Sequence, residues 1–157
     1  MPLDDTNADP NAARKRWMSV LSRAGRDALE DAYERLDAAP GYGLLRPPET
    51  GLVMVQGRAN GTGQRFNAGE MTVTRCSVRL GDGSVGHAYV AGRDRRHAEL
   101  AALFDALLQD PARSADLERD VIVPLARVQQ DARERTRRKS AATKVDFFTM
   151  VRGEDPA

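Results

Sequence analysis

The spacing of apolar residues changes period twice along the chain, and this change constrains the fold more than any other feature. Residues 17–36 and 100–108 place apolar side chains three and four positions apart, as one face of a helix does. Between them, residues 42–91 are rich in β-branched residues and alternate in polarity, as strands do. Helices placed before and after a block of strands, instead of alternating with it, predict an α+β fold.

The first helical block follows Asp9-Pro10, because aspartate is a good helix cap and proline is tolerated in the first turn. A glycine, Gly25, interrupts the apolar stripe. The sequence therefore predicts two helices in series or one helix bent at Gly25, with these buried residues: Trp17, Val20, Leu21, Ala24, Leu29, Ala32, Tyr33 and Leu36.

The strand block predicts an antiparallel meander of three to four strands. Strands are expected at 52–55, 71–78 and 85–89, with turns at 60–63 and 81–84. Asp82-Gly83 favours a type I′ turn. The fourth strand of this range would be formed by residues 42–46 and would end at Pro47-Pro48.

A third helix is predicted from Asp94, its expected cap, to Asp110-Pro111. It carries the clearest apolar stripe of the chain, formed by Leu100, Leu103, Phe104, Leu107 and Leu108. A short turn around Leu117 and Val121 is expected next. Pro124 then fits the first turn of a last helix that reaches about Lys139.

The C-terminus is unusually apolar, with five large side chains in seven positions: Val145, Phe147, Phe148, Met150 and Val151. Leaving all five in water would forgo roughly 10 kcal/mol, so this segment is expected to dock on its own domain or on a partner. We therefore predict a disordered lead-in (1–10), a single α+β domain (11–143) and a docking C-terminal arm (144–157).

Composition restricts the function classes. The 157 residues carry a net charge of +1, which gives no overall field to attract nucleic acid or an anionic membrane. No apolar run approaches the length of a membrane span, so a cytoplasmic protein is expected. Cys76 is the single cysteine, which excludes an internal disulfide, and its strand pattern predicts a buried, inert thiol. No residues have metal-ligand spacing, so no cofactor is expected in this chain.

A glycine-rich segment runs from Gly61 to Gly69 and contains Arg65. Backbone amides exposed by glycines can cradle phosphate. Known phosphate loops are followed by a helix, however, whereas a strand is predicted after this segment. A hairpin connection is favoured, and a phosphate cradle remains the alternative.

Charged residues crowd the start of the third predicted helix: Arg93, Asp94, Arg95, Arg96, His97 and Glu99. Free amides and arginine forks can bind an anion there. A capped helix with solvated charges is the simpler interpretation. His97 lies at the rim of the apolar stripe, where a half-buried, hydrogen-bonded ring is favoured over a proton carrier.

A basic cluster spans Arg133 to Lys144 and adjoins the C-terminal arm. Positive side chains near a helix C-terminus complement its dipole, which explains the cluster without a ligand. A polyanion site is the alternative, but no aromatic residues interleave to stack bases, so specific nucleic-acid binding is disfavoured.

Several segments together resemble the PhnG family, a subunit of the bacterial carbon–phosphorus lyase system. They are Arg16-Trp17-Met18-Ser19-Val20-Leu21, Glu49-Thr50-Gly51-Leu52-Val53, Gly61-Thr62-Gly63-Gln64-Arg65-Phe66, Gly69-Glu70, Thr72-Val73-Thr74-Arg75, Gly92-Arg93-Asp94, His97-Ala98-Glu99 and Val145 to Gly153. The resemblance covers roughly residues 14–153 and is strongest in the C-terminal segment.

The resemblance implies a role in phosphonate use under phosphate starvation. Family members join subunits H, I and J in a core complex. With H, I and L they are needed to displace adenine from ATP by an alkylphosphonate, which gives ribose 1-alkylphosphonate 5-triphosphate. The iron–sulfur cluster and S-adenosylmethionine belong to subunit J, and no catalysis is assigned to G alone.

This points to an assembly subunit with no catalytic residues of its own. If the chain contacts the substrate, Arg65, Arg93 and His97 are the expected residues, because a triphosphate and a phosphonate require cationic donors. The apolar residues of the arm (Val145, Phe147, Phe148, Met150 and Val151) are the expected partner interface. The rival hypothesis is a stand-alone phosphate-binding enzyme that uses the Gly61–Gly69 loop and Arg93.

Overall fold

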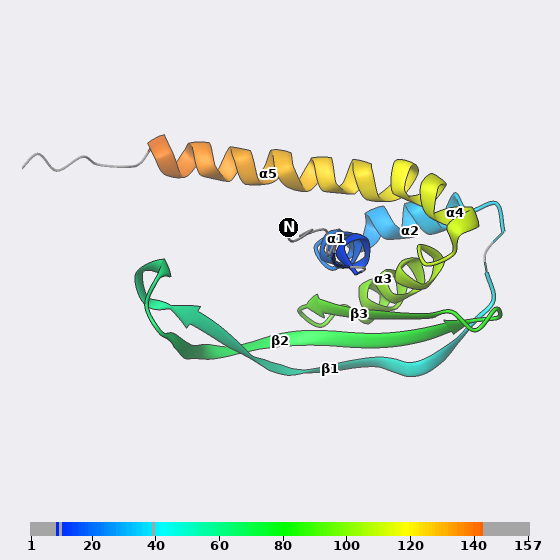
Figure 1. Cartoon of the computed structure of the whole chain (residues 1–157), viewed down its shortest axis with the longest axis horizontal. Coiled ribbons are helices and arrows are strands. Elements are labelled where there is room, and N and C mark those ends of the chain that lie inside the picture. The colour runs from blue at the N-terminus through cyan, green and yellow to red at the C-terminus, as the bar shows by residue number, and fades with distance from the viewer. Residues whose placement is uncertain (1–8, 10, 39, 143–157) are drawn as a thin grey trace, which may run out of the picture.

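The computed structural model describes residue 9 and residues 11–38 and 40–142. In this part of the chain a three-stranded sheet is covered on one face by helices (Figure 1). The elements are α1 (Ala12–Leu21), α2 (Arg26–Glu34), β1 (Tyr42–Arg58), η1 (Ala59–Gly61), β2 (Arg65–Leu80), β3 (Val85–Ala91), α3 (Arg95–Leu107), α4 (Pro111–Leu117), η2 (Glu118–Ile122) and α5 (Val123–Ala142). The predicted α+β fold is confirmed.

Two separate helices, α1 and α2, form the N-terminal block. Gly25 has an extended backbone (φ −72°, ψ 145°) and caps α2, so the chain breaks there instead of bending one helix. The predicted apolar stripe is buried at Trp17, Leu21 and Leu29.

The sheet is antiparallel, with the order β1-β2-β3 and β2 in the centre. The prediction of a separate strand at 42–46 is wrong, because β1 continues through Pro47-Pro48 to Arg58. Its pairing with β2 shifts register twice around these prolines, between Leu44 and Arg46 and between Arg46 and Glu49. β1 is an edge strand, where a missing N–H does not interrupt the sheet.

The turn between β2 and β3 also differs from the prediction. A type I′ turn needs positive φ at both central residues, but of Asp82 and Gly83 only Gly83 has it, at φ 93°. Gly83 N donates to Leu80 O, and the Asp82 side chain accepts from Ser84 N at 2.8 Å. The aspartate thus stabilises the turn through its side chain, and the glycine takes the left-handed position.

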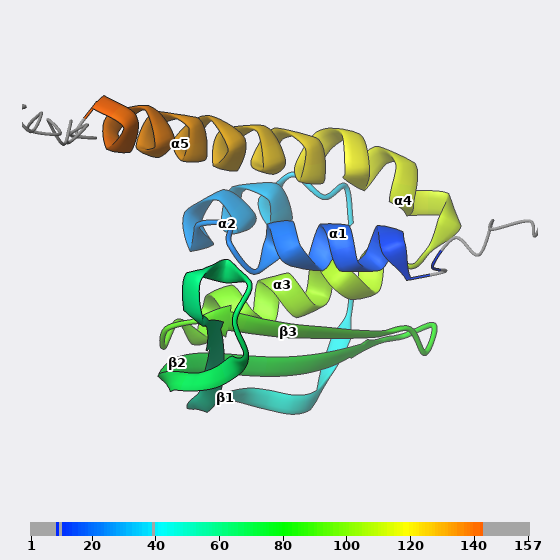
Figure 2. The same cartoon turned by 60° about the vertical axis from the view of Figure 1, so that its left-hand side comes forward.

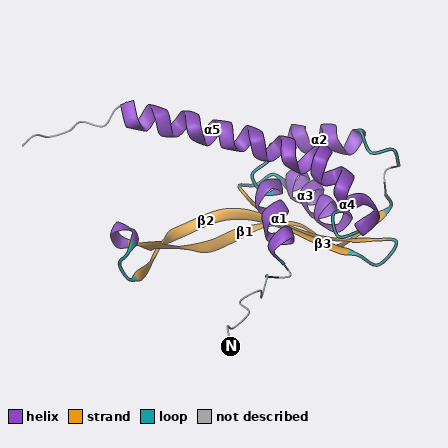
Figure 3. Cartoon of the chain, turned by 45° about the horizontal axis from the view of Figure 1, so that its top comes forward, coloured by secondary structure: helices purple, strands orange, loops and turns teal. Residues whose placement is uncertain are grey.

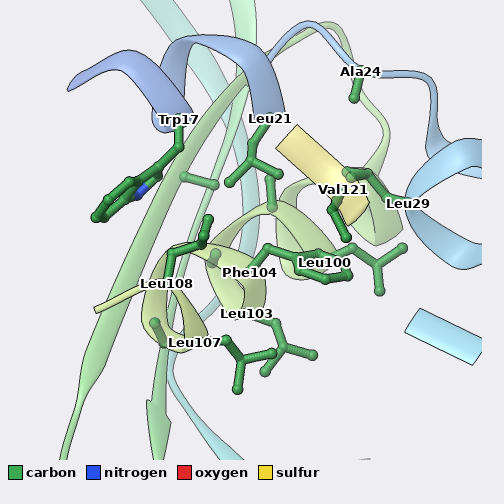
Figure 4. Close-up of a cluster of buried hydrophobic side chains, with 14 of the residues drawn as sticks. Trp17, Leu21, Ala24, Leu29, Leu100, Leu103, Phe104, Leu107, Leu108 and Val121 are labelled. Atoms are coloured by element: carbon green, nitrogen blue, oxygen red, sulfur yellow. The ribbon is translucent and has the colours of Figure 1, made fainter. Parts of the chain in front are cut away.

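The core lies where α3 meets the sheet on one side and α1 and α2 on the other (Figures 2 and 4). The whole predicted stripe of α3 is at most 2% exposed: Leu100, Leu103, Phe104, Leu107 and Leu108. Asp94 caps α3 as predicted, and its Oδ1 accepts from His97 N at 2.9 Å.

The backbone of β3 lies unusually close to α3 at Gly86. A Cβ on this residue would lie 1.9 Å from the carbonyl oxygen of Ala102 and 2.5 Å from the amide nitrogen of Ala106. Only glycine permits this distance between strand and helix.

The last helical block begins at α4, where the Asp110 carboxylate caps the helix by accepting from Ala112 N. The predicted turn around Leu117 and Val121 is the short helix α4 followed by one π-helical turn, η2. This turn precedes Pro124, which lacks the N–H that a regular helix needs. α5 then extends to Ala142, three residues beyond the predicted end.

Two elements extend past the body in the same direction, the β1–β2 hairpin and α5 (Figures 1 and 3). β3 pairs with β2 only from Val73 to Arg79. Residues 51–72, which we call the hairpin arm, therefore form a two-stranded ribbon. From Asp131 to Ala142 the residues of α5 are exposed.

Candidate functional site

The start of α3 is the first candidate site. Gly92 directly follows the last residue of β3 and has φ 91°. Its N–H donates to Thr72 O at 2.9 Å. The next residue, Arg93, is exposed on the turn and makes no hydrogen bond or ion pair with the described part of the chain. Its guanidinium is thus available to an external anion. The Asp94 side chain already accepts from a backbone amide at the start of α3, that of His97.

His97 lies one turn further along α3 and is engaged within the fold. It is 8% exposed, and its Nε2 lies 2.9 Å from the carbonyl oxygen of Leu21 at the end of α1. The predicted hydrogen bond is confirmed, but the ring is buried and not half-buried as the sequence suggested. Contact of His97 with a substrate stays a prediction, and the observed geometry assigns the ring to joining α1 and α3.

Arg96 belongs to a half-exposed polar network that links α2, β1 and α3. Its guanidinium donates twice to Glu30, at 3.0 and 2.9 Å, and lies 5.5 Å from the ring centre of Tyr33. The bonds from Arg96 lower the pKa of Glu30. Beside it, the Tyr42 hydroxyl donates to Glu99 at 2.5 Å, and burial together with this bond raises the pKa of Tyr42 to about 12.

The glycine-rich segment connects the two strands of the hairpin arm, as the favoured interpretation predicted: residues 61–64 lie at the tip, and residues 65–69 belong to β2. Asn60 and Gly61 adopt left-handed backbones, at φ 51° and 78°, which η1 requires to reverse the chain. Arg65 begins β2 directly opposite Arg58 of β1 and is exposed.

Arg65 and Arg93 do not meet. Thr72, which binds Gly92, lies seven positions along β2 from Arg65, which corresponds to about 20 Å of extended strand. Figure 1 shows the tip of the arm far from the start of α3. The described chain therefore does not bring the Gly61–Gly69 loop and Arg93 into one pocket.

A groove of about 360 Å³ lies between α1 and β3. Its lining is mostly apolar and includes Met18, Leu21, Ala88 and Tyr89, and neither Arg65 nor Arg93 borders it. The lining also includes Lys15, Ser19, Ser22 and His87, but Lys15 is paired with Asp9 and the His87 ring lies 2.8 Å from the Ser77 hydroxyl.

Cys76 is 1% exposed on the core face of β2, and burial raises the pKa of its thiol to about 11. The predicted burial of this thiol is confirmed. Within residues 11–38 and 40–142, no group of three or more His, Cys, Asp or Glu side chains is arranged to hold a metal ion. In the same segments no helix has both the length and the apolar character needed to cross a membrane.

Asp105 is the buried polar residue that sequence reasoning missed. Its fully buried carboxylate accepts from Arg14, from the indole of Trp17 at 2.8 Å and from the backbone N–H of His87 at 2.9 Å. The available signal was its position inside the leucine stripe of α3, where a charged residue requires partners.

Comparison with known proteins identifies the family. The family model described as phosphonate metabolism protein PhnG matches residues 12–153. The chain belongs to the PhnG family. A PhnG protein of Rhizobium meliloti (strain 1021), named as a subunit of alpha-D-ribose 1-methylphosphonate 5-triphosphate synthase, is 47% identical over 156 residues, which cover 99% of each chain.

The PhnG match includes every described helix and strand and continues into residues 143–153. The predicted interface residues of the C-terminal arm lie outside the described residues: Val145, Phe147, Phe148, Met150 and Val151. Most of the basic cluster of this PhnG chain, from Arg133 to Lys139, lies on the exposed end of α5.

Proposed function

We propose that this chain is an accessory, non-catalytic subunit of a complex that transfers the ribose triphosphate moiety of ATP to an alkylphosphonate and displaces adenine. The partners are subunits H, I and J of the core complex, with L for the transfer step, in the cytoplasm. ATP is a substrate of the complex, and the iron–sulfur cluster and S-adenosylmethionine belong to subunit J. The observation that carries the proposal is the nearly full-length, 47% identical relative named as a synthase subunit.

The chemistry of the described residues supports an accessory role. Cys76 is buried with a raised pKa, His97 is bound to Leu21, and the Asp105 carboxylate is occupied by donors of its own fold. None of these groups is free to act as a nucleophile or a general base on an external substrate.

Arg93 is the residue that we propose contacts the substrate of the complex. Its guanidinium is exposed and unpaired within the described chain, and such a group binds phosphate or phosphonate oxygens with two parallel hydrogen bonds. The site would then be completed by a catalytic subunit that faces the start of α3.

Co-expression tests the proposal. The full chain, carrying an affinity tag, is produced with subunits H, I and J, and the same is done with a chain that ends at residue 143. We expect the full chain to recover all three subunits in a stable complex and the shortened chain to lose them, because the apolar arm is the predicted interface. A full chain that purifies alone and folded would overturn the proposal.

The rival function, a stand-alone phosphate-binding enzyme, predicts turnover by the isolated chain. The separation of the Gly61–Gly69 loop from Arg93 gives it no common pocket in the described residues. Adenine release from ATP and methylphosphonate by the isolated chain would restore this hypothesis.

A further inference from the structure

The hairpin arm has no support from the rest of the sheet. β3 ends at Ala91, opposite Val73, and beyond the bond from Gly92 N to Thr72 O neither edge of the ribbon formed by residues 51–72 pairs with another strand among the described residues. A two-stranded hairpin in water is marginally stable by itself. The arm is nevertheless long, since β1 has 17 residues and β2 has 16, against 7 in β3.

Large apolar side chains are exposed on both faces of the arm. Leu52 (62% exposed) and Met54 (52%) share the face of Thr50, whose hydroxyl meets that of the buried Thr74 on the helix-bearing side. Val55, Met71 and Phe66, at 39, 43 and 52% exposed, lie on the opposite face. Exposed apolar surface of this extent is typical of protein interaction sites, and its presence on both faces suits a groove better than a flat surface.

The tip of the arm is positively charged. Arg58 and Arg65 lie directly opposite each other across the ribbon, an arrangement of like charges that is unfavourable without a counter-ion. Arg58 donates to the backbone of Gly63, and neither arginine forms an ion pair with a carboxylate of the described chain. A complementary partner would therefore supply acidic groups where the tip lies.

We propose that the hairpin arm inserts into an apolar groove of another subunit of the synthase, and that carboxylates of this subunit bind Arg58 and Arg65. The inference rests on the proposed function and adds a second interface, distinct from the C-terminal arm. A second copy of this chain is a poor occupant, because residues 55–69 of its arm contain no carboxylate that could bind Arg58 and Arg65.

Serine substitutions on one face of the arm test the inference. Leu52→Ser combined with Met54→Ser removes exposed apolar surface that does not belong to the core cluster. The matched control is Leu44→Ser, a leucine of the same strand that is 46% exposed but lies outside the arm. Each tagged full chain is co-expressed with subunits H, I and J, and its thermal unfolding is measured alone.

We expect the Leu52→Ser and Met54→Ser chain to recover at least about tenfold less of its partners, as for central interface residues, with an unfolding temperature like that of the wild type. The Leu44→Ser chain should recover them fully. The inference would be overturned if the arm variant recovered as much of subunits H, I and J as the wild type does, or if Leu44→Ser lost as much as the arm variant. In either case the proposed function would stand. A wild-type chain that recovers no subunit would instead contradict the proposed function.

Charge variants test the tip separately. Arg58→Glu with Arg65→Glu should abolish recovery, whereas Arg58→Lys with Arg65→Lys should retain most of it and make it more sensitive to salt. Unchanged recovery after charge reversal would exclude acidic groups at the tip. The isolated wild-type chain could instead form concentration-dependent dimers that the serine variant does not form. This result would show that the arm binds a second copy of the chain, and it would overturn the choice of partner.

Discussion

Arg14 on α1 and Asp105 on α3 form an ion pair whose carboxylate is fully buried, with hydrogen bonds of 3.1 and 2.7 Å. Trp17 and the backbone of His87 donate to the same carboxylate, so that α1, α3 and β3 meet at one side chain. The pair also holds the register of β3 against the helices, because the His87 amide belongs to that strand.

Replacing Asp105 with alanine should therefore destabilise the fold strongly. The substitution removes the acceptor of the Trp17 indole and of the His87 N–H and leaves Arg14 only the Val85 carbonyl oxygen, so we expect the free energy of unfolding to fall by about 3 kcal/mol. This is the lower end of the range for buried pairs, since the Arg14 side chain is 30% exposed. Urea unfolding measures the loss. Asp120→Ala, which removes an exposed ion pair with Arg119, is the control and should change little.

Gly86→Ala should be among the most damaging small substitutions in the chain. Its Cβ would overlap the backbone of α3 at Ala102 and Ala106, so strand and helix must separate. We expect a loss of about 3 kcal/mol or more in the free energy of unfolding, measured by denaturant. Gly43→Ala is the matched control because no atom lies within 4 Å of its Cβ position. Equal stability of the two variants would contradict the close approach.

Stability should fall in alkaline solution. The folded-state pKa values of Cys76 and Tyr42 are raised, to about 11 from 9.0 and to about 12 from 10.0. Above pH 9 the Cys76 thiol of the unfolded chain loses its proton before that of the folded chain, and above pH 10 the same holds for the Tyr42 hydroxyl. The free energy of unfolding therefore keeps its full value below pH 9 and decreases as the pH rises toward 12. Denaturant unfolding from pH 8 to pH 12 measures this decrease. Tyr42→Phe should make the free energy of unfolding depend less on pH in the upper part of that range. An unchanged slope in that variant would assign the effect to other groups.

Arg93→Ala should impair turnover without preventing assembly. If the guanidinium binds phosphate or phosphonate oxygens, its loss should lower adenine release by the complex on the order of 100-fold. Arg95→Ala, an exposed arginine two positions further along, is the control and should retain most of the activity. Loss of the complex itself with Arg93→Ala would make Arg93 a structural residue.

The elements that sequence reasoning predicted well are those defined by near neighbours. The leucine stripe of α3 and its Asp94 cap depend on residues within a few positions of each other. The break at Gly25 is equally local, although choosing between two helices and one bent helix required the structure. The errors also have physical causes: Pro47-Pro48 is compatible with an edge strand, and the turn at Asp82-Gly83 is stabilised by the aspartate side chain.

The sequence could predict which residue types form the candidate site, but not where these residues lie relative to one another in space. Arg65 and Arg93 are predicted as cationic donors to a triphosphate and a phosphonate, and both are exposed. Their separation follows from the length of the arm, which depends on how far β3 extends along β2. The single carboxylate within the leucine stripe, Asp105, acquires its role from Arg14, which lies 91 positions away.

The sequence by itself determined the main helices, the α+β class and the family, because periodicity, capping and motif spacing are properties of neighbouring residues. The tertiary structure alone decided which charges are paired, which glycine is indispensable, and which apolar residues remain exposed. Leu52 and Leu100 are both leucines in regular elements, yet one is 62% exposed and the other fully buried. The difference arises because β3 stops at Ala91, opposite Val73, and burial depends on which segments meet in space.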